Sequence, residues 1–116
     1  MGDDSIRVTA TTVRVPVFNS HSESVNIETK KHANCEQIRS ALKDAPGVQV
    51  LDDPGVSLYP HAWSATGQDD VFVGRVRLDN SHPCGLAMWV VSDNLRKGAA
   101  LNAVQIAEQL VQMELV

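Results

Sequence analysis

Residues 92–110 read SDNLRKGAALNAVQIAEQL, and they carry the chain from an apolar run over residues 85–91 into a long helix. The apolar run has apolar side chains at both odd and even positions, which favours a central strand covered on both faces. From Ala99 to Leu115, apolar residues recur at positions 100, 103, 104, 107, 110 and 111. This spacing predicts an amphipathic helix whose stripe docks on a sheet or on another domain.

The junction between the strand and the helix is polar and basic. Arg96 and Lys97 lie beside the expected helix start, where free backbone N–H groups and the helix dipole would attract an anion such as phosphate. A capped helix with a solvated basic turn explains the same residues, because short motifs of this kind often match by chance. Both interpretations stay open from the residues alone.

The segments before the apolar run supply another strand and a loop. Residues 71–79 alternate, with Arg75 and Arg77 opposite Val76 and Leu78, which predicts a strand with one face in water. Residues 52–70 have no sustained period and contain Pro54, Gly55, Pro60 and Gly67. We expect a long loop there, and in a compact domain such a loop is more often functional or part of an interface than idle.

A short helix precedes this loop. Asn34 is a good N-cap and Gln37 stands at the third helical position, which completes a capping box. Apolar residues then follow at helical spacing until the break at Pro46 and Gly47, namely at Ile38, Ala41, Leu42 and Ala45. A short strand over residues 48–51 is expected after the break.

The first third of the chain is rich in β-branched residues. Residues 6–17 alternate and predict a strand that ends, bulges or lies at an edge near Pro16, and residues 22–30 predict a second strand with Val25 and Ile27 on one face. The order of elements then contains a hairpin-like pair at each end. It predicts an α+β fold with a mixed, mainly antiparallel sheet and helices on one face.

Composition excludes several classes of protein. The 116 residues suit one domain or part of a larger one, and no apolar run is long enough for a membrane helix. A net charge of −4 with five aromatic residues offers neither the basic stripe nor the stacking platform that nucleic acid needs. The acidic N-terminal residues do not resemble a signal peptide, so a cytoplasmic location is the default expectation.

Arg14 and His21 are the candidate site residues in the first third. A bend at residues 18–20 would fold the second strand back and bring the two side chains within reach of one small ligand. A guanidinium holds a carboxylate with two hydrogen bonds, and an imidazole moves a proton near neutral pH. A solvent-facing arginine on a half-exposed strand and a histidine in a turn would look the same in the sequence.

The cysteines and the other histidines give weaker signals. Cys35 lies in the first turn of the expected helix, where the dipole favours a thiolate, but Glu36 and Gln37 add negative charge and capping groups instead of an oxyanion pocket. An inert thiol is therefore the preferred interpretation. Cys35 and Cys84 lack the spacing of a zinc site or a disulfide framework, and the remaining histidines lie at no ligand spacing, so no metal site is expected.

Three stretches together resemble the C-terminal part of bacterial aspartate-semialdehyde dehydrogenase. They are TVRVPVFNSHSESVN over residues 12–26, GRVR over residues 74–77, and residues 86–91 followed by SDNLRKGAALNAVQIAE over residues 92–108. The resemblance covers nearly the whole chain, with a long motif near each end in the right order. It implies part of a catalytic and dimerisation domain that is similar to that of glyceraldehyde-3-phosphate dehydrogenase.

The resemblance also implies an activity and residue roles. Members of the family reduce aspartyl phosphate to aspartate semialdehyde with NADPH, through a cysteine thioacyl intermediate, on the pathway to lysine, threonine and methionine. Arg14 matches the arginine that grips the substrate carboxylate, His21 the histidine that acts as acid and base, and Asn94 a position that contacts the cofactor. The last helix matches one that packs on the nucleotide domain, and a homodimer is implied.

The chain departs from the family pattern in length and content. Family members are about three times as long, and these 116 residues contain neither the GxGxxG turn of a dinucleotide-binding domain nor the nucleophile motif. Cys35 follows His21 instead of preceding it, so it does not inherit the nucleophile's role. We therefore expect residues 1–116 to be a C-terminal part without its NADP-binding domain and inactive alone. The alternatives are a non-enzymatic homodimerisation module and a small anion-binding module.

Overall fold

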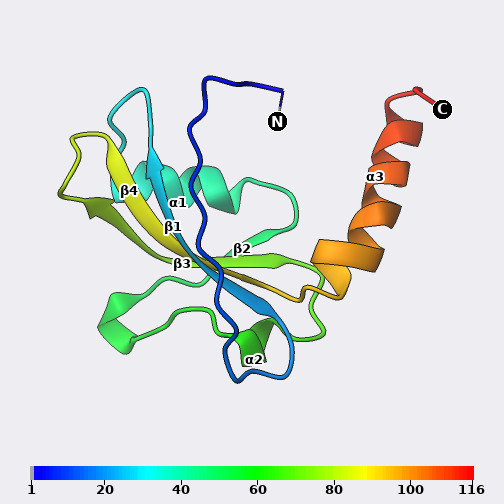
Figure 1. The fold of residues 1–116 in the computed structure, drawn as a ribbon, viewed down its shortest axis with the longest axis horizontal. Helices are drawn as coiled ribbons and strands as arrows, with labels where there is room; N and C mark the ends of the chain where they lie inside the picture. The colour runs from blue at the N-terminus through cyan, green and yellow to red at the C-terminus, as the bar shows by residue number, and fades with distance from the viewer. Residues whose placement is uncertain (1) are drawn as a thin grey trace.

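The computed structural model describes residues 2–116, which form one four-stranded sheet with helices against it (Figure 1). Along the chain the elements are β1 (His21–Glu28), α1 (Cys35–Lys43), β2 (Val48–Val50), the 3-10 turn η1 (Pro54–Val56), α2 (Ala62–Ala65), β3 (Val71–Asp79), β4 (Gly85–Ser92), the π-helical turn η2 (Arg96–Ala100) and α3 (Leu101–Gln112). No helix in this described part combines the length and apolar character that a membrane span requires.

The sheet is mixed and mainly antiparallel. Its strand order is β1-β4-β3-β2. Strand β4 pairs antiparallel with both β1 and β3, whereas the short β2 pairs parallel with β3. The predicted fold class is confirmed, and so is the central place of the apolar run over residues 85–91.

The two faces of the sheet are covered by different helices. Alternate strand residues point to opposite faces. One face packs against α1 through a core that contains Val73, Val76, Leu86 and Met88. The other face packs against α2, where Ala65 contacts Phe72 and Val91. The expectation of helices on one face is therefore too simple, because the segment over residues 52–70, expected to be a loop, contains the short α2.

Helix α1 begins as the sequence predicts. The Asn34 side chain accepts a hydrogen bond from the Gln37 backbone N–H at 2.9 Å, and the Gln37 side chain accepts one from the Asn34 N–H at 3.0 Å. This reciprocal pair satisfies two backbone donors that a helix end leaves without partners. Ile38 and Leu42 pack on the sheet from the buried side of the helix.

The prediction of a strand over residues 6–17 is wrong for this structure. The segment is extended but belongs to no strand, and all its residues are exposed. In Figure 1 it crosses in front of the sheet as a coil. Strand β1 pairs with β4 and forms no hairpin with residues 6–17. A strand needs a hydrogen-bonded neighbour as well as an alternating pattern, and no segment within residues 2–116 supplies one.

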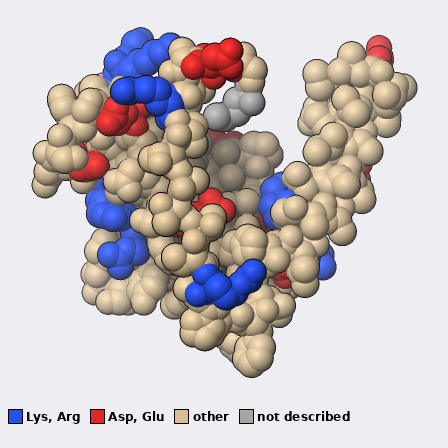
Figure 2. Space-filling model, in the orientation of Figure 1, with Lys and Arg blue, Asp and Glu red and all other residues tan. Residues whose placement is uncertain are grey.

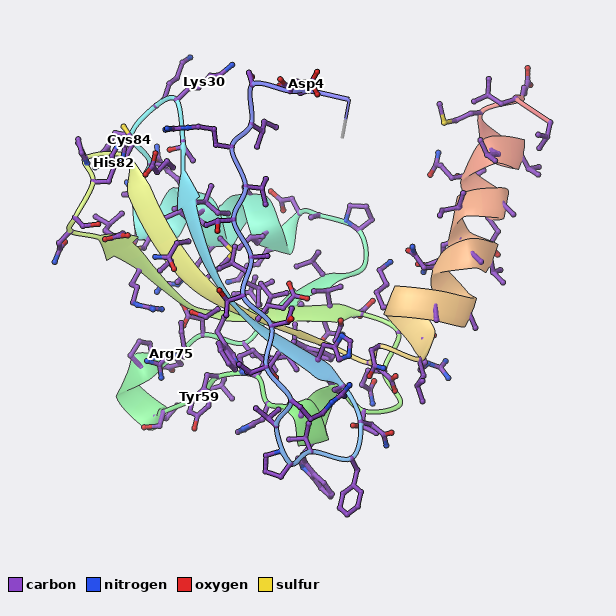
Figure 3. The ribbon with its side chains drawn as sticks, in the orientation of Figure 1. Asp4, Lys30, Tyr59, Arg75, His82 and Cys84 are labelled. Atoms are coloured by element: carbon purple, nitrogen blue, oxygen red, sulfur yellow. The ribbon has the colours of Figure 1, made fainter. Side chains whose placement is uncertain are left out.

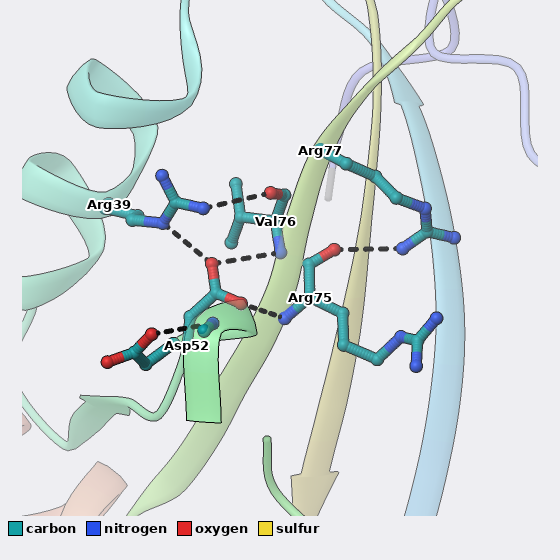
Figure 4. Close-up of polar contacts among 7 residues, drawn as sticks. Arg39, Asp52, Arg75, Val76 and Arg77 are labelled. Carbon is teal, nitrogen blue, oxygen red and sulfur yellow. Dashed lines mark hydrogen bonds and ion pairs between the residues drawn. The ribbon is translucent and has the colours of Figure 1, made fainter. Parts of the chain in front are cut away.

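A β-bulge in β3 is held by the Asp52 carboxylate (Figure 4). The register with β4 shifts between Gly74 and Arg77, and Arg75 has a φ of 53°. The side chain of Asp52, only 2% exposed, accepts hydrogen bonds from the backbone N–H of Arg75 at 2.6 Å and of Val76 at 3.2 Å. One carboxylate thus satisfies the backbone donors that the bulge removes from the ladder.

The winding that leads into the last helix begins at Arg96, three residues before the expected start at Ala99, and the helix stands apart from the sheet. The chain winds as a π-helical turn over 96–100 before α3 begins at Leu101. Figure 1 shows α3 projecting away from the sheet, and its principal contacts are with η2. The apolar stripe that the sequence predicts is present, but Val104 and Val111 are 54% and 62% exposed.

Candidate functional site

The candidate residues His21 and Asn94 come from the same end of the sheet. His21 is the first residue of β1 and lies opposite Ser92, the last residue of β4. Asn94 follows two residues later, just before η2. The antiparallel register of β1 and β4 therefore brings together two positions that are 73 residues apart in the sequence.

The residue before His21 is buried and adopts an unusual backbone conformation. Ser20 is 4% exposed and has a φ of 74°, in the left-handed region that residues other than glycine seldom adopt. Its Oγ lies 3.1 Å from the Oγ1 of Thr66, at the end of α2. Thr66 Oγ1 in turn donates to the carbonyl oxygen of Ala62 at 2.8 Å.

The residue before Asn94 is a buried carboxylate. Asp93 is 5% exposed, and its Oδ2 accepts a hydrogen bond from the Gly67 backbone N–H at 2.8 Å. Its Oδ1 accepts one from the Leu95 N–H at 2.9 Å. The hydrogen bond from Gly67 is the largest cause that lowers the pKa of Asp93 below its ordinary value, and the bond from Leu95 acts in the same direction.

Asn94 fits a ligand contact, although it offers only part of a nucleotide site. Its side chain is half-buried and makes no hydrogen bond to another residue of the described chain. An amide offers both donors and an acceptor, so it could contact the hydroxyl, amide or phosphate groups of NADP.

Arg14 lies in the exposed segment before β1. Its side chain makes no hydrogen bond or ion pair with any described residue, and nothing of that kind joins it to His21. Two shallow surface hollows of the described chain lie elsewhere, at the β3–β4 turn and along α3. The shared pocket expected for Arg14 and His21 therefore stays a prediction.

Arg96 and Lys97, the basic pair beside the last helix, already have polar partners in the described chain. Arg96 forms an ion pair with Asp69, and Lys97 Nζ donates to Gln105 Oε1 at 2.6 Å. With Asp93 also at this junction, two carboxylates lie near the helix start. These contacts favour a basic turn with its own polar partners over an anion site, since a free anion would meet negative charge there. In Figure 2 the visible surface of α3 carries few charged groups.

The cysteine and histidine side chains form no further candidate site in the described part of the chain. Cys35 and Cys84 are free, and Cys35 packs against the core beneath α1. Figure 3 places His82 and Cys84 together at the β3–β4 turn, whereas Tyr59 and Arg75 lie near each other elsewhere, with the guanidinium carbon 5.8 Å from the ring centroid. Among residues 2–116 no three His, Cys, Asp or Glu side chains gather as a metal site would require.

Comparison with known proteins identifies the family. Residues 1–97 match the family described as semialdehyde dehydrogenase, dimerisation domain. The chain belongs to this semialdehyde dehydrogenase family. It is 55% identical over 116 residues to the aspartate-semialdehyde dehydrogenase of Aquifex aeolicus, and 58% identical over 111 residues to that of Legionella pneumophila. These matches cover 100% and 95% of this chain but only 34% and 32% of the two relatives.

Solved structures of the family share the fold. A crystal structure of aspartate semialdehyde dehydrogenase II from Vibrio cholerae, complexed with ASA, is 47% identical with a TM-score of 0.79, covering 85% of this chain and 29% of that one. A probable aspartate-semialdehyde dehydrogenase from Pseudomonas aeruginosa gives a TM-score of 0.73 at 38% identity, covering 83% of this chain and 28% of that one. The resemblance to the C-terminal part of these semialdehyde dehydrogenases is confirmed, and the chain spans about a third of the length of its curated relatives.

Sequence reasoning missed three residues next to the candidate site. Asp93 had a signal, because an aspartate in a turn commonly accepts from the backbone N–H two residues later, as it does here from Leu95. Ser20 and Thr66 had none, since their contact joins positions 46 residues apart.

Proposed function

We propose that this chain is the C-terminal substrate-binding and dimerisation part of an aspartate-semialdehyde dehydrogenase. The whole enzyme would reduce aspartyl 4-phosphate to aspartate 4-semialdehyde with NADPH, in the biosynthesis of lysine, threonine and methionine. The observation that carries this proposal is the family match over residues 1–97 together with 55% identity to the Aquifex aeolicus relative along the full chain. The two free thiols suit a reducing compartment such as the cytoplasm.

In the proposed enzyme the three candidate residues have different roles. Arg14 would bind the substrate carboxylate through two parallel N–H donors. His21 would transfer a proton to and from the reacting thiol and its substrate. Arg14 and His21 are exposed, and neither side chain pairs with another described residue, so both are available to a ligand. Asn94 would contact NADP. The nucleophilic cysteine and the nucleotide-binding fold would come from other parts of the enzyme, so the 116 residues alone would be inactive.

Dimerisation is the second part of the proposal. The family description names a dimerisation domain, and this chain exposes apolar side chains that a monomer would normally bury. The exposed residues include Val8, Val13, Val15, Val104 and Val111. A second copy, or the remainder of the enzyme, would cover such surfaces.

A chimera tests the enzymatic proposal. It joins this chain to the part of the Aquifex aeolicus relative that lies outside the matched 34%. We expect phosphate-dependent reduction of NADP by aspartate semialdehyde in the chimera and none in the 116 residues alone. His21→Ala should lower kcat by about 100-fold, the scale of a lost general acid or base. His32→Ala, at an exposed histidine outside the elements, is the control. Equal activity of both variants would contradict the role of His21.

The non-enzymatic homodimer remains the second candidate, because exposed apolar side chains favour it without any chemistry. It predicts that the 116 residues self-associate at micromolar concentration and that a folded chimera has no turnover. Sedimentation velocity on the chain and the activity assay on the chimera separate the two functions.

A further inference from the structure

The hydroxyl groups of Ser20 and Thr66 have a defined direction of hydrogen bonding. Thr66 Oγ1 has one proton, and its contact with the carbonyl oxygen of Ala62 uses that proton because a carbonyl only accepts. The 3.1 Å contact between Ser20 and Thr66 must then be donated by Ser20 Oγ. Without Thr66 Oγ1, the buried Ser20 hydroxyl would lose its acceptor.

This hydrogen bond fixes the backbone at the start of β1. A serine at a φ of 74° is strained, and such a conformation persists only where surrounding contacts determine it. The Ser20 side chain is buried against the end of α2, so the turn at the end of α2 sets the direction in which the chain enters β1. His21 is the next residue, and its position follows from that direction.

Gly67, the next residue of the same turn, holds the segment that carries Asn94. Gly67 has a φ of 80°, and this conformation directs its N–H to Asp93 Oδ2 at 2.8 Å. Asp93 Oδ1 meanwhile accepts from Leu95 N–H, so the carboxylate links the segment around Asn94 to Gly67. Two consecutive residues, Thr66 and Gly67, thus hold the segments that carry His21 and Asn94.

We propose that the turn formed by Thr66 and Gly67 is the positioning element of the site, holding His21 through Ser20 and Asn94 through Asp93. The turn touches neither substrate nor cofactor. Its effect on chemistry rests on the proposed function, whereas its effect on backbone geometry does not.

The first test uses the chimera described above. Thr66→Val should lower kcat by about tenfold with an unchanged KM for NADP, because a small displacement of the proton-transfer group slows chemistry. Asp93→Asn should raise the KM for NADP by about tenfold with kcat nearly unchanged, since the amide nitrogen of asparagine cannot accept the second hydrogen bond. Thr66→Ser keeps the hydroxyl and should keep full activity.

Several outcomes would overturn the proposal. If Thr66→Val and Asp93→Asn change kcat and KM in parallel, or change neither, the turn has only a structural role. Ser20→Ala removes the same hydrogen bond from the other side, so Ser20→Ala combined with Thr66→Val should be no slower than either single variant. Additive losses in the double variant would contradict the mechanism, even if Thr66→Val were poorly folded.

The second test needs no activity and uses the 116 residues themselves. Amide hydrogen exchange of residues 20–24 should speed up by about tenfold in Thr66→Val, the scale of one lost hydrogen bond, and remain unchanged in Thr9→Val at an exposed threonine. Unchanged exchange in Thr66→Val would overturn the positioning role. If the exchange result holds while the parent chimera lacks turnover, the proposed function fails and the positioning role of the turn stands.

Discussion

Arg39 Nε donates a hydrogen bond to Asp52 Oδ2 at 2.7 Å, and this pair ties helix α1 to the bulge of β3. The same carboxylate accepts from the backbone of Arg75 and Val76, while Arg39 also donates to the Val76 carbonyl oxygen at 3.2 Å. Helix α1 and strand β3 are therefore joined through one side chain that is almost completely buried. A buried carboxylate is tolerated because every contact it makes is with a donor.

Asp52→Asn should destabilise the fold by about 3 kcal/mol. The amide nitrogen of asparagine would face donors at Arg39 or at the bulge, which breaks a buried pair by removing one partner. Urea unfolding of the variant and the parent chain measures the difference. Asp44→Asn, at an exposed aspartate whose side chain makes no hydrogen bond in the described chain, is the control and should change stability by less than about 0.5 kcal/mol. Equal stability of the two variants would contradict the role of Asp52.

Gly74→Ala should destabilise the sheet severely. A Cβ at this position would lie 2.2 Å from the carbonyl oxygen of Leu51 and 2.6 Å from Cδ of Pro60, so the backbone would have to move. Overpacking of this kind costs about 3 kcal/mol or more. Gly98→Ala is the matched control, since its new Cβ would meet only Asn94 Cβ at 3.8 Å and alanine favours a helix. Thermal unfolding that ranks Gly98→Ala below Gly74→Ala would refute this account of the β3 bulge region.

Asn34→Ala should cost about 1 kcal/mol through the loss of the cap of α1. Each side chain makes one of the two hydrogen bonds of the box, so Gln37→Ala should remove the bond that Asn34→Ala leaves in place. Chemical denaturation of the parent and both variants provides the measurement. Asn80→Ala, at an exposed asparagine of the β3–β4 turn, serves as the control. A larger loss in Asn80→Ala than in Asn34→Ala would show that the cap contributes little.

Acid should weaken the contacts made by Asp93. The folded state lowers the pKa of this carboxyl below its ordinary value of 3.8, chiefly through the Gly67 N–H. A depressed pKa contributes stability that is fully present above 3.8 and is lost as the pH falls through the lower, folded value. The free energy of unfolding should therefore fall more steeply below pH 3.8 in the parent than in Asp93→Asn. Parallel pH profiles of the two proteins would rule out this contribution.

Val104→Glu with Val111→Glu should reduce self-association of the chain. Both valines are more than half exposed on α3, so the change removes apolar surface without disturbing the core. Charges placed on an apolar contact surface oppose its burial. Sedimentation velocity should show a shift toward monomer, with unchanged unfolding by urea. Glu108→Gln combined with Gln109→Glu keeps the net charge of α3 and serves as the control. An unaltered assembly state in the double valine variant would place the contact elsewhere.

Local signals in the sequence predicted much of this fold. The capping box at Asn34, the central strand over residues 85–91 and the last helix were recognisable because each depends on neighbours in the sequence. The strand expected over residues 6–17 was wrong because pairing depends on a partner that alternation does not reveal. The bulge at Arg75 was not foreseen either, since it depends on a carboxylate 23 residues earlier in the chain.

Less of the candidate site than of the fold could be predicted from the residues alone. Arg14, His21 and Asn94 were selected by a resemblance to a family, and the register of β1 with β4 gives two of them a common location. The contacts that surround them, from Ser20 to Thr66 and from Asp93 to Gly67, each connect distant parts of the chain. Such contacts leave no periodic pattern, so three-dimensional structure was needed to find them.

Because α3 is attached to the rest of the chain at one end, a small rotation at that end moves its far end the most. Its 12 residues extend about 18 Å at the usual rise per residue, and a tilt of about 10° at its base would move the far end by about 3 Å. The π-helical turn over 96–100 is that base, and single turns of this type are frequent at functional sites. A substitution within these five residues would change the direction of the whole helix and so displace every side chain of α3. A substitution within α3 itself would alter only the surroundings of that residue.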